Sequence, residues 1–154
     1  YVDAYLLGAD AILSKPFDLE HLAALIQRMT LPPEDKWSLK PSMRPRRQLN
    51  RSFDHIEYSI RDQQLGIGRG GVLLAEPPQF SAVGDLIEFK LEFSFGPIRI
   101  LEGIGSCRWV RAENEGKLPS GLGLQIEFLK AESRRQFIEW LKQYPTPAYI
   151  PRVF

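Results

Sequence analysis

The chain has 154 residues, of which 44% are hydrophobic and 25% are charged, and its formal net charge is +1. This composition is typical of a globular protein with one domain, or with one domain and a fragment of another. The single cysteine, Cys107, excludes an internal disulfide bond and a cysteine-based zinc site. No stretch approaches about 18 uncharged apolar residues, so we expect a cytoplasmic protein that does not insert into a membrane.

The N-terminal residues 1–29 predict a helix–strand–helix unit. Gly8 stands where a first helix would end, and the short apolar run at 11–13 predicts a buried strand. Asp18 can cap a second helix. In that helix the apolar residues recur at the spacing of one helical face, at Leu22, Leu25, Ile26 and Met29.

Residues 7–17 resemble the end of a response-regulator receiver domain. The resemblance implies that Lys15 corresponds to the lysine that contacts the phosphorylated aspartate in that family, and that its bond to Pro16 is cis. Only the last quarter of such a domain is present, so we expect its acidic pocket and phosphoacceptor to lie before Tyr1. This receiver remnant lacks the rest of its parallel sheet and its phosphoacceptor. We therefore expect it to act as a packing or dimer-forming appendage.

Residues 30–42 predict a linker between this remnant and the rest of the chain. It contains Pro32, Pro33 and Pro41 and shows no sustained periodicity, which favours a semi-extended conformation. Trp37 is its largest apolar residue, and we expect this side chain to hold the linker against a neighbouring surface.

Residues 43–144 predict a β-rich domain. Apolar and polar residues alternate with a period of two, which predicts strands with one solvated face at 56–60, 87–93 and 124–128. A longer strand is expected over 98–111, where Gly103 and Gly105 favour a bend or a bulge. Glycines at 84 and 96 supply turns before and after the 87–93 strand.

A helix is expected to close this domain. Ser133 and Gln136 have the spacing of a capping box, and the helix after them would turn Phe137, Ile138 and Leu141 inward. Several short strands followed by one helix predict a small barrel or sandwich with a helical plug. Residues 145–154 are left as a C-terminal tail.

Five segments of the domain resemble, in the same order, the PilZ family of bacterial signalling domains. They are the pattern Arg47-x-x-x-Arg51 and residues 71–74, 83–87, 107–111 and 121–128, and from the first to the last they span about 80 residues. The resemblance implies a small antiparallel β-barrel with a C-terminal helix. It also implies an effector that binds the second messenger cyclic di-GMP and passes the signal to a protein partner.

Arg47 and Arg51 fit the Arg-x-x-x-Arg half of the PilZ binding motif. In that family these arginines reach the guanine edges and phosphates of an intercalated ligand dimer. A guanidinium suits this role because it donates two parallel hydrogen bonds to guanine, neutralises phosphate and stacks on a base. Arg46 would add positive charge beside them. The alternative interpretation is a solvated basic linker.

The second half of the motif, Asp/Asn-x-Ser-x-x-Gly, aligns with Gly66, Gly68 and Gly71, and only the last glycine agrees. Glycine lacks the side chains that hydrogen-bond the ligand, and each loss costs roughly 1–3 kcal/mol. Backbone N–H groups of the turn, which also contains Arg69 and Gly70, would have to hold a phosphate instead. The alternative function is therefore a ligand-independent adaptor that acts through protein contacts, in pilus assembly or motility.

Other functions are less well supported by the sequence. The glycines at 66–71 have the spacing of a dinucleotide-binding fingerprint, but two prolines follow where a helix would have to begin. His21 and His55 lack a metal-ligand spacing, and no catalytic constellation is visible, so we expect neither an enzyme nor a cofactor. Residues 44–51 hold four arginines without interleaved aromatic residues, so we do not expect nucleic-acid binding.

Overall fold

The computed structural model describes residues 13, 15–32, 34–62, 64–75, 81–114 and 120–144. Of the strand expected at 11–13, only Leu13 is among the described residues. That predicted strand and the C-terminal tail at 145–154 therefore lie outside them. The account of the fold that follows concerns the described residues alone.

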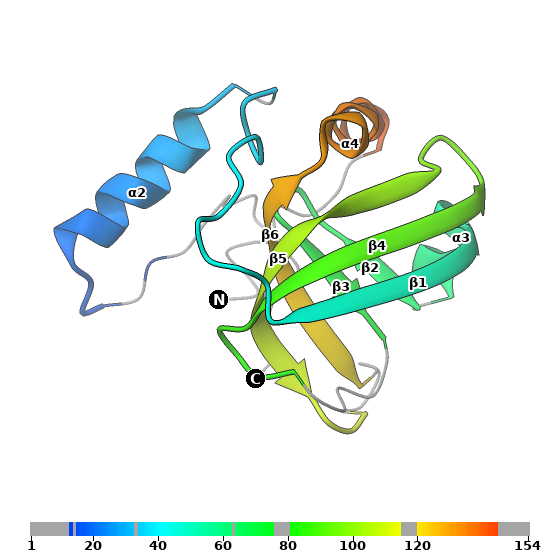
Figure 1. The fold of residues 1–154 in the computed structure, drawn as a ribbon, viewed down its shortest axis with the longest axis horizontal. Helices are drawn as coiled ribbons and strands as arrows, with labels where there is room; N and C mark the ends of the chain where they lie inside the picture. The colour runs from blue at the N-terminus through cyan, green and yellow to red at the C-terminus, as the bar shows by residue number, and fades with distance from the viewer. Residues whose placement is uncertain are drawn as a thin grey trace.

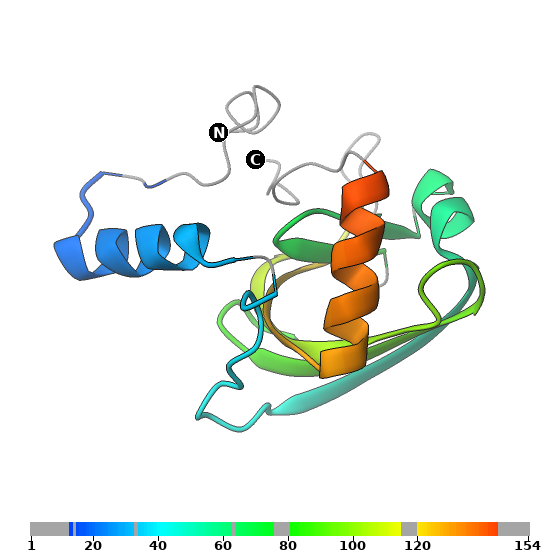
Figure 2. The same ribbon diagram turned by 90° about the horizontal axis from the view of Figure 1, so that it is seen from above.

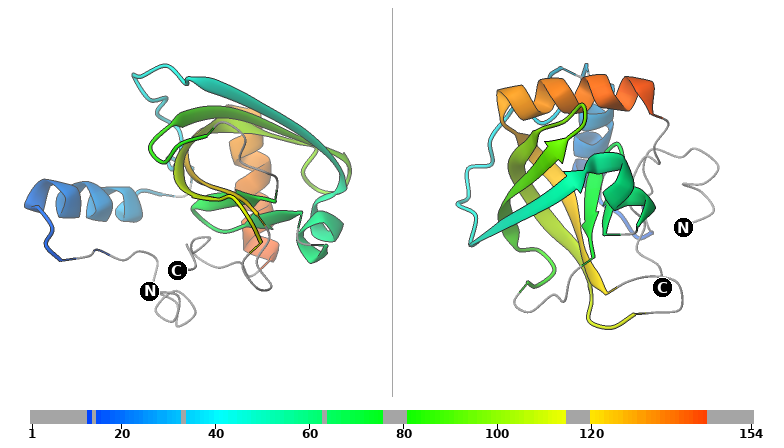
Figure 3. Two further views of the ribbon diagram at one scale, coloured as in Figure 1. Left: turned by 90° about the horizontal axis from the view of Figure 1, so that it is seen from below. Right: turned by 90° about the vertical axis from the view of Figure 1, so that its right-hand side faces the viewer.

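The fold is mainly β, as the sequence predicts, and consists of one curled sheet of six strands in the order β1-β4-β5-β6-β3-β2. The strands are β1 (Arg47–His55), β2 (Leu65–Ile67), β3 (Gly71–Leu74), β4 (Leu86–Phe95), β5 (Ile100–Arg111) and β6 (Gly121–Leu129). Figure 1 shows the sheet face-on, and the left view of Figure 3 shows its curvature into a half-barrel.

The expectation of a wholly antiparallel barrel is wrong at one pairing. β1 runs parallel to β4, with Arg47 opposite Ile87 and Phe53 opposite Phe93. The other neighbouring strands pair antiparallel. A parallel pair needs a crossover connection. Here the chain leaves β1 through a helix and the β2–β3 hairpin at the far edge before it returns as β4.

The strand predicted at 56–60 is instead the helix α3 (Ile56–Arg61). Ile56 and Ser59 are buried and Ile60 is half-buried, which is the i, i+3, i+4 spacing of a helical face. The apolar residues at 56 and 60 fit both the period of two of a strand and the i, i+4 spacing of a helix. Their spacing therefore could not distinguish a strand from a helix. The backbone N–H of Glu57 donates to Nδ1 of His55 at 3.2 Å, so the histidine at the end of β1 caps the first turn of α3.

The hydrophobic core lies on the concave side of the sheet. The alternation predicted for β4 is confirmed, because Ile87, Phe89, Leu91 and Phe93 are buried in this core. The opposite side chains of the same strand, from Glu88 to Glu92, are half-buried or exposed. The core continues through β5, β6 and the inner face of the helix α4 (Ala131–Gln143).

The predicted turns and the predicted irregularity of β5 are present. Gly84 and Gly96 have φ angles of 94° and 110°, in the left-handed region that favours glycine. The register between β5 and β6 shifts between Ile104 and Gly105. A Cβ atom at Gly103 would lie 2.0 Å from the carbonyl oxygen of Phe128. Only glycine allows these two backbones to approach so closely.

Trp37 anchors the linker to the sheet, as the sequence predicts. Its carbonyl accepts a hydrogen bond of 2.9 Å from the backbone N–H of Leu129, and its ring centroid lies 5.4 Å from that of Phe137. Trp37 is itself buried, at a φ of 60° that is unusual for a residue other than glycine. The burial of the indole therefore holds a backbone conformation that the residue would otherwise avoid.

The helix α4 covers one open end of the half-barrel (Figures 2 and 3). The predicted inward position of Phe137 is confirmed, and Trp140 is buried as well. The prediction of a capping box at Ser133 and Gln136 is wrong, because Lys130 occupies the N-cap position and no side chain caps the helix. The hydroxyl of Ser133 instead donates to the carbonyl of Ile100 and accepts from the N–H of Glu102, which ties the helix to β5.

The second predicted helix of the N-terminal unit is present as α2 (Leu19–Thr30). It stands apart from the sheet in Figure 2, and Ile26 and Met29 on its predicted apolar face are 52% and 41% exposed. The peptide bond between Lys15 and Pro16 is cis. None of the described helices is long and apolar enough to cross a membrane.

We predict that Phe137→Ala lowers the free energy of unfolding by about 3–5 kcal/mol, because it removes a fully buried ring that Trp37 and Trp140 contact. Urea denaturation measures the change. The matched control is Glu139→Ala, on the exposed face of the same helix, with an expected effect within about 0.5 kcal/mol. Equal losses in the two variants would contradict the assignment of α4 as the plug of the core.

Candidate functional site

The arginines of the predicted motif lie on the concave side of an edge strand. Side chains alternate between the two faces of a strand, so Arg47 and Arg51 share a face with Leu49 and Phe53. Leu49 is buried and Phe53 is half-buried against the core. Both arginines are exposed, because β1 is the edge of the sheet. The two guanidinium groups therefore border the core without being enclosed in it.

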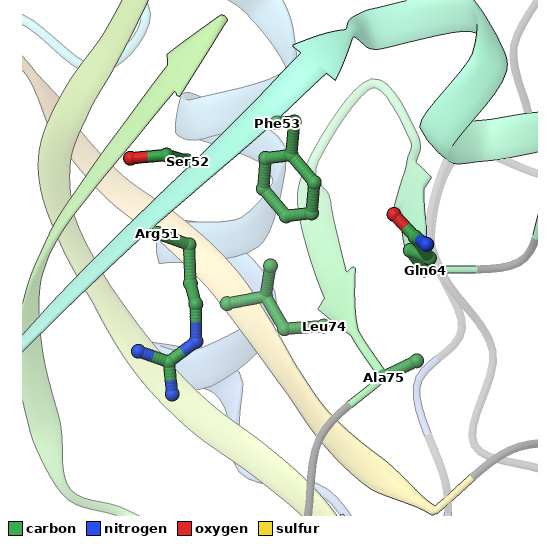
Figure 4. Close-up of a pocket in the computed structure, with 6 residues that line it drawn as sticks. All are labelled: Arg51, Ser52, Phe53, Gln64, Leu74 and Ala75. Carbon is green, nitrogen blue, oxygen red and sulfur yellow. The ribbon is translucent and has the colours of Figure 1, made fainter.

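Arg51 lines a cavity of about 270 Å³ between β1 and the base of the β2–β3 hairpin (Figure 4). Its other lining residues are Ser52, Phe53, Gln64, Leu74 and Ala75. In Figure 4 the side chains of Arg51 and Phe53 extend from the same side of β1, and that of Ser52 extends from the other. The residues that line the cavity thus include an arginine, a phenylalanine and a glutamine beside the apolar side chains of Leu74 and Ala75.

Two contacts fix the geometry of this cavity. Nη1 of Arg51 donates to the carbonyl oxygen of Asn50 at 2.7 Å, which holds the guanidinium close to its own strand. The ring of Phe53 stacks on that of Phe93 in β4, with 5.6 Å between centroids and 20° between planes. The Phe53 ring is therefore held in place by a core residue, whereas Arg51 stays exposed at the surface.

Arg47 and Arg46 lie at the start of β1. Nε of Arg47 is 3.6 Å from a carboxylate oxygen of Asp85, and the same oxygen accepts the backbone N–H of Ala82 at 3.0 Å. The side chain of Arg47 is 41% exposed and that of Asp85 is 14% exposed. The backbone N–H of Arg46 donates to the carbonyl of Leu86 at 3.0 Å. The side chain of Arg46 is exposed.

The predicted glycine turn connects β2 to β3 at the other end of the hairpin. Gly66 pairs with Leu73 inside the hairpin, and Arg69 is exposed at the tip of the turn. Backbone groups of Gly68, Gly70 and Gly71 form hydrogen bonds within the turn or to the sheet. The N–H of Gly68 donates to the carbonyl of Gly71 at 2.9 Å, and the carbonyl of Gly70 accepts from Ile126 at 3.0 Å. The N–H of Gly68 is thus already engaged inside the turn.

The two halves of the predicted motif therefore come from opposite sides of the sheet. A continuous row of neighbouring residues joins Arg47 to the turn through Ile87, Gly105, Ile126 and Gly70. That row crosses four inter-strand steps, or about 19 Å along the curved sheet. Arg51 instead meets Leu74 and Ala75 at the base of the hairpin. It is this curvature, rather than sequence proximity, that brings β1 towards the hairpin.

The sequence did not single out four residues of this region: Ser52, Phe53, Gln64 and Asp85. A period of two from Arg51 would have placed Phe53 on the same face. No signal in the sequence pointed to Gln64, because its position depends on how α3 returns the chain to β2. The N–H of Gln64 donates to the carbonyl of Ser59 at 2.9 Å, which sets that return.

Two further side chains that could carry chemistry, Cys107 and Arg111, are buried within the described part of the fold. Cys107 is buried, and burial together with the nearby charge of Asp85 raises the pKa of its thiol above the ordinary value. The guanidinium of Arg111 stacks on the ring of Trp109 at 4.8 Å. Within the part of the chain that the structure describes, no three His, Cys, Asp or Glu side chains are grouped to hold a metal ion.

Comparison with models of known protein families gives no match for this chain, and comparison with curated proteins gives none either. The assignment of a function therefore depends on the residues and geometry described above.

We predict that Cys107 of the folded protein reacts many-fold more slowly with iodoacetamide near pH 8 than the same residue in denaturant. The thiolate is the reactive form, and the raised pKa of this buried thiol keeps it protonated at that pH. Mass spectrometry of the alkylated protein gives both rates. Similar rates in the two conditions would show that the thiol is accessible and that β5 is not packed as described.

Proposed function

We propose that this chain is an output domain of a bacterial signalling protein and that it binds cyclic di-GMP. The observation that carries the proposal is the cavity that Arg51, Phe53 and Gln64 line together. The likeness of the sequence to PilZ domains supports the same ligand. In this proposal one guanine of the ligand enters the cavity, and the phosphates stay outside it near Arg46 and Arg47.

The chemistry of the cavity suits a guanine. A guanidinium donates bidentately to O6 and N7 of guanine, and an amide can hydrogen-bond the rest of the base edge. The Phe53 ring offers an apolar face for stacking. At about 270 Å³ the cavity lies just below the usual range of roughly 300–1,000 Å³ for small-molecule sites. That volume suits one base better than a whole dinucleotide.

The exposed arginines at the start of β1 suit the anionic part of the ligand. Arg47 lies four residues before Arg51 in β1, which separates their Cα atoms by about 13 Å. Arg46 is exposed beside it. Phosphates that bind here compete with the Asp85 carboxylate for the guanidinium of Arg47, so this ion pair sets part of the cost of binding.

We predict that isothermal titration calorimetry with cyclic di-GMP gives a saturable isotherm and that Arg51→Ala weakens the affinity by about 10- to 150-fold. The variant removes a charged donor, and such hydrogen bonds contribute roughly 1.5–3 kcal/mol. The matched control is Arg108→Ala, which removes an exposed arginine from β5 and should bind as the unaltered protein does. The proposal is lost if the unaltered protein gives no heat with ligand at about 100 μM, since functional binding should be tighter than that.

The second candidate function is a ligand-independent adaptor. Two observations favour it. Gly66 and Gly68 lack the side chains that the PilZ motif supplies, and the turn that contains Gly68 lies at the opposite end of the hairpin from the Arg51 cavity. An adaptor would need a protein-binding surface and would bind its partner with or without nucleotide.

A further inference from the structure

The linker between α2 and β1 crosses the surface as a strap, residues 36–46, that is held at both ends. Near its start Trp37 is buried, and the carbonyl of this residue accepts the backbone N–H of Leu129 at 2.9 Å. At its end the N–H of Arg46 donates to the carbonyl of Leu86 at 3.0 Å. Figure 2 shows this segment on the outside of the molecule, between α2 and the start of β1. The strap is therefore fixed in place, while the side chains between its ends are half-buried or exposed.

The strap is cationic along its whole length. It carries no acidic residue, and its four basic residues are Lys36, Lys40, Arg44 and Arg46. Glu34 and Asp35 precede it, and after it the next acidic residue is Asp54. In the described part of the chain, none of the four basic side chains is paired with a carboxylate. Their positive charge is therefore available to a partner.

Two large apolar side chains project from the same strap. Leu39 is 83% exposed and Met43 is 68% exposed. Each directly precedes a basic residue, Lys40 in one case and Arg44 in the other. A single exposed apolar residue is common on protein surfaces. Two of them among unpaired cations indicate a partner that offers negative charge and an apolar layer together.

A lipid bilayer with anionic headgroups fits this combination better than a nucleic acid does. Phosphates of a nucleic acid would attract the cations but would leave Leu39 and Met43 in water. The strap also lacks an exposed aromatic side chain for stacking on bases, because Trp37 is buried. A bilayer presents its charge at the headgroups and its apolar layer just beneath them.

We propose that the strap binds the surface of an anionic lipid bilayer. The basic side chains contact the headgroups, and Leu39 and Met43 reach the boundary of the acyl chains. Each lysine or arginine near such a surface strengthens binding by about fivefold, so four of them favour an anionic over a neutral bilayer by up to several hundredfold. The chain then lies on the membrane surface and binds it reversibly.

This inference goes beyond the proposed binding of cyclic di-GMP and does not depend on it. Vesicle binding is measured without nucleotide, and calorimetry with the nucleotide is carried out without vesicles. The strap variants used below keep Arg46, Arg47 and Arg51, the arginines of the proposed nucleotide site. Either proposal can therefore fail while the other stands.

The test is co-sedimentation of the unaltered protein with lipid vesicles. One set of vesicles contains phosphatidylcholine alone, and in the other about one third of the lipid is phosphatidylglycerol. We expect saturable binding to the anionic vesicles, at least about tenfold tighter than to the neutral ones, and weaker binding at high salt. Equal binding to both sets, or binding to neither, overturns the proposal.

Charge reversal in the strap separates it from general attraction to a basic protein. The double variant Lys40→Glu with Arg44→Glu should bind anionic vesicles at least about tenfold more weakly. The matched control, Arg99→Glu with Lys142→Glu, makes the same change of net charge at exposed positions outside the strap and should bind as the unaltered protein does. Equal losses in the two double variants overturn the proposal. Circular dichroism confirms that both variants are folded.

Removal of the apolar side chains separates a lipid surface from a nucleic acid. Leu39→Ser with Met43→Ser keeps every charge and should weaken binding to anionic vesicles by at least about fivefold. Phe95→Ser, which alters a residue that is 66% exposed outside the strap, should leave it unchanged. If the serine double variant binds these vesicles as the unaltered protein does, while both bind a short DNA duplex more tightly, the strap is a nucleic-acid site and the proposal is overturned.

Discussion

The alternation of side chains along β1 decides which way its arginines face and where this strand lies in the sheet. Because Leu49 and Phe53 face the core, Arg47 and Arg51 must face the same way. A guanidinium that is buried without a partner is costly, so a strand with this pattern is stable only where the charged groups still reach water. That condition places β1 at the edge of the sheet. It also explains why a cavity lies beside Arg51, while the interior of the half-barrel is filled by apolar side chains.

The open sheet is held by its ends rather than by closure. The helix α4 inserts Phe137 and Trp140 into the core, and the linker places Trp37 against the ring of Phe137. Ser133 joins the helix to β5 through two backbone groups. At the other side, His55 caps α3, and the short helix contacts both β1 and β2. Among the described residues, these contacts keep the two edges near each other without a hydrogen-bonded ladder between them.

The sequence predicted the parts of the fold that local periodicity controls. The alternation in β4, the glycine turns around it and the inward position of Phe137 are all present. It failed where two periods fit the same residues, as at Ile56 and Ile60, and where tertiary contacts use a side chain differently, as with Ser133. The parallel pairing of β1 was also not predictable from the sequence, because it depends on the path of the crossover. For the candidate site, the sequence identified Arg51 but not the base of the hairpin that faces it, since curvature of the sheet brings these segments together.

The two proposed functions use the same surface, because each depends on the arginines of β1. Phosphate and carboxylate are both anions that a guanidinium binds, so Arg47 and Arg51 alone do not discriminate between them. Discrimination comes from what lies between and around the arginines. A turn with acidic and hydroxyl side chains would favour a guanine nucleotide, but Gly66 and Gly68 supply neither. The apolar side chains of Leu49 and Phe53, which alternate with the arginines on the same face of β1, are suited to contact with a protein as well as with a base. A turn without polar side chains would therefore weaken nucleotide binding, while it leaves the surface around Arg47 and Arg51 unchanged for a protein partner.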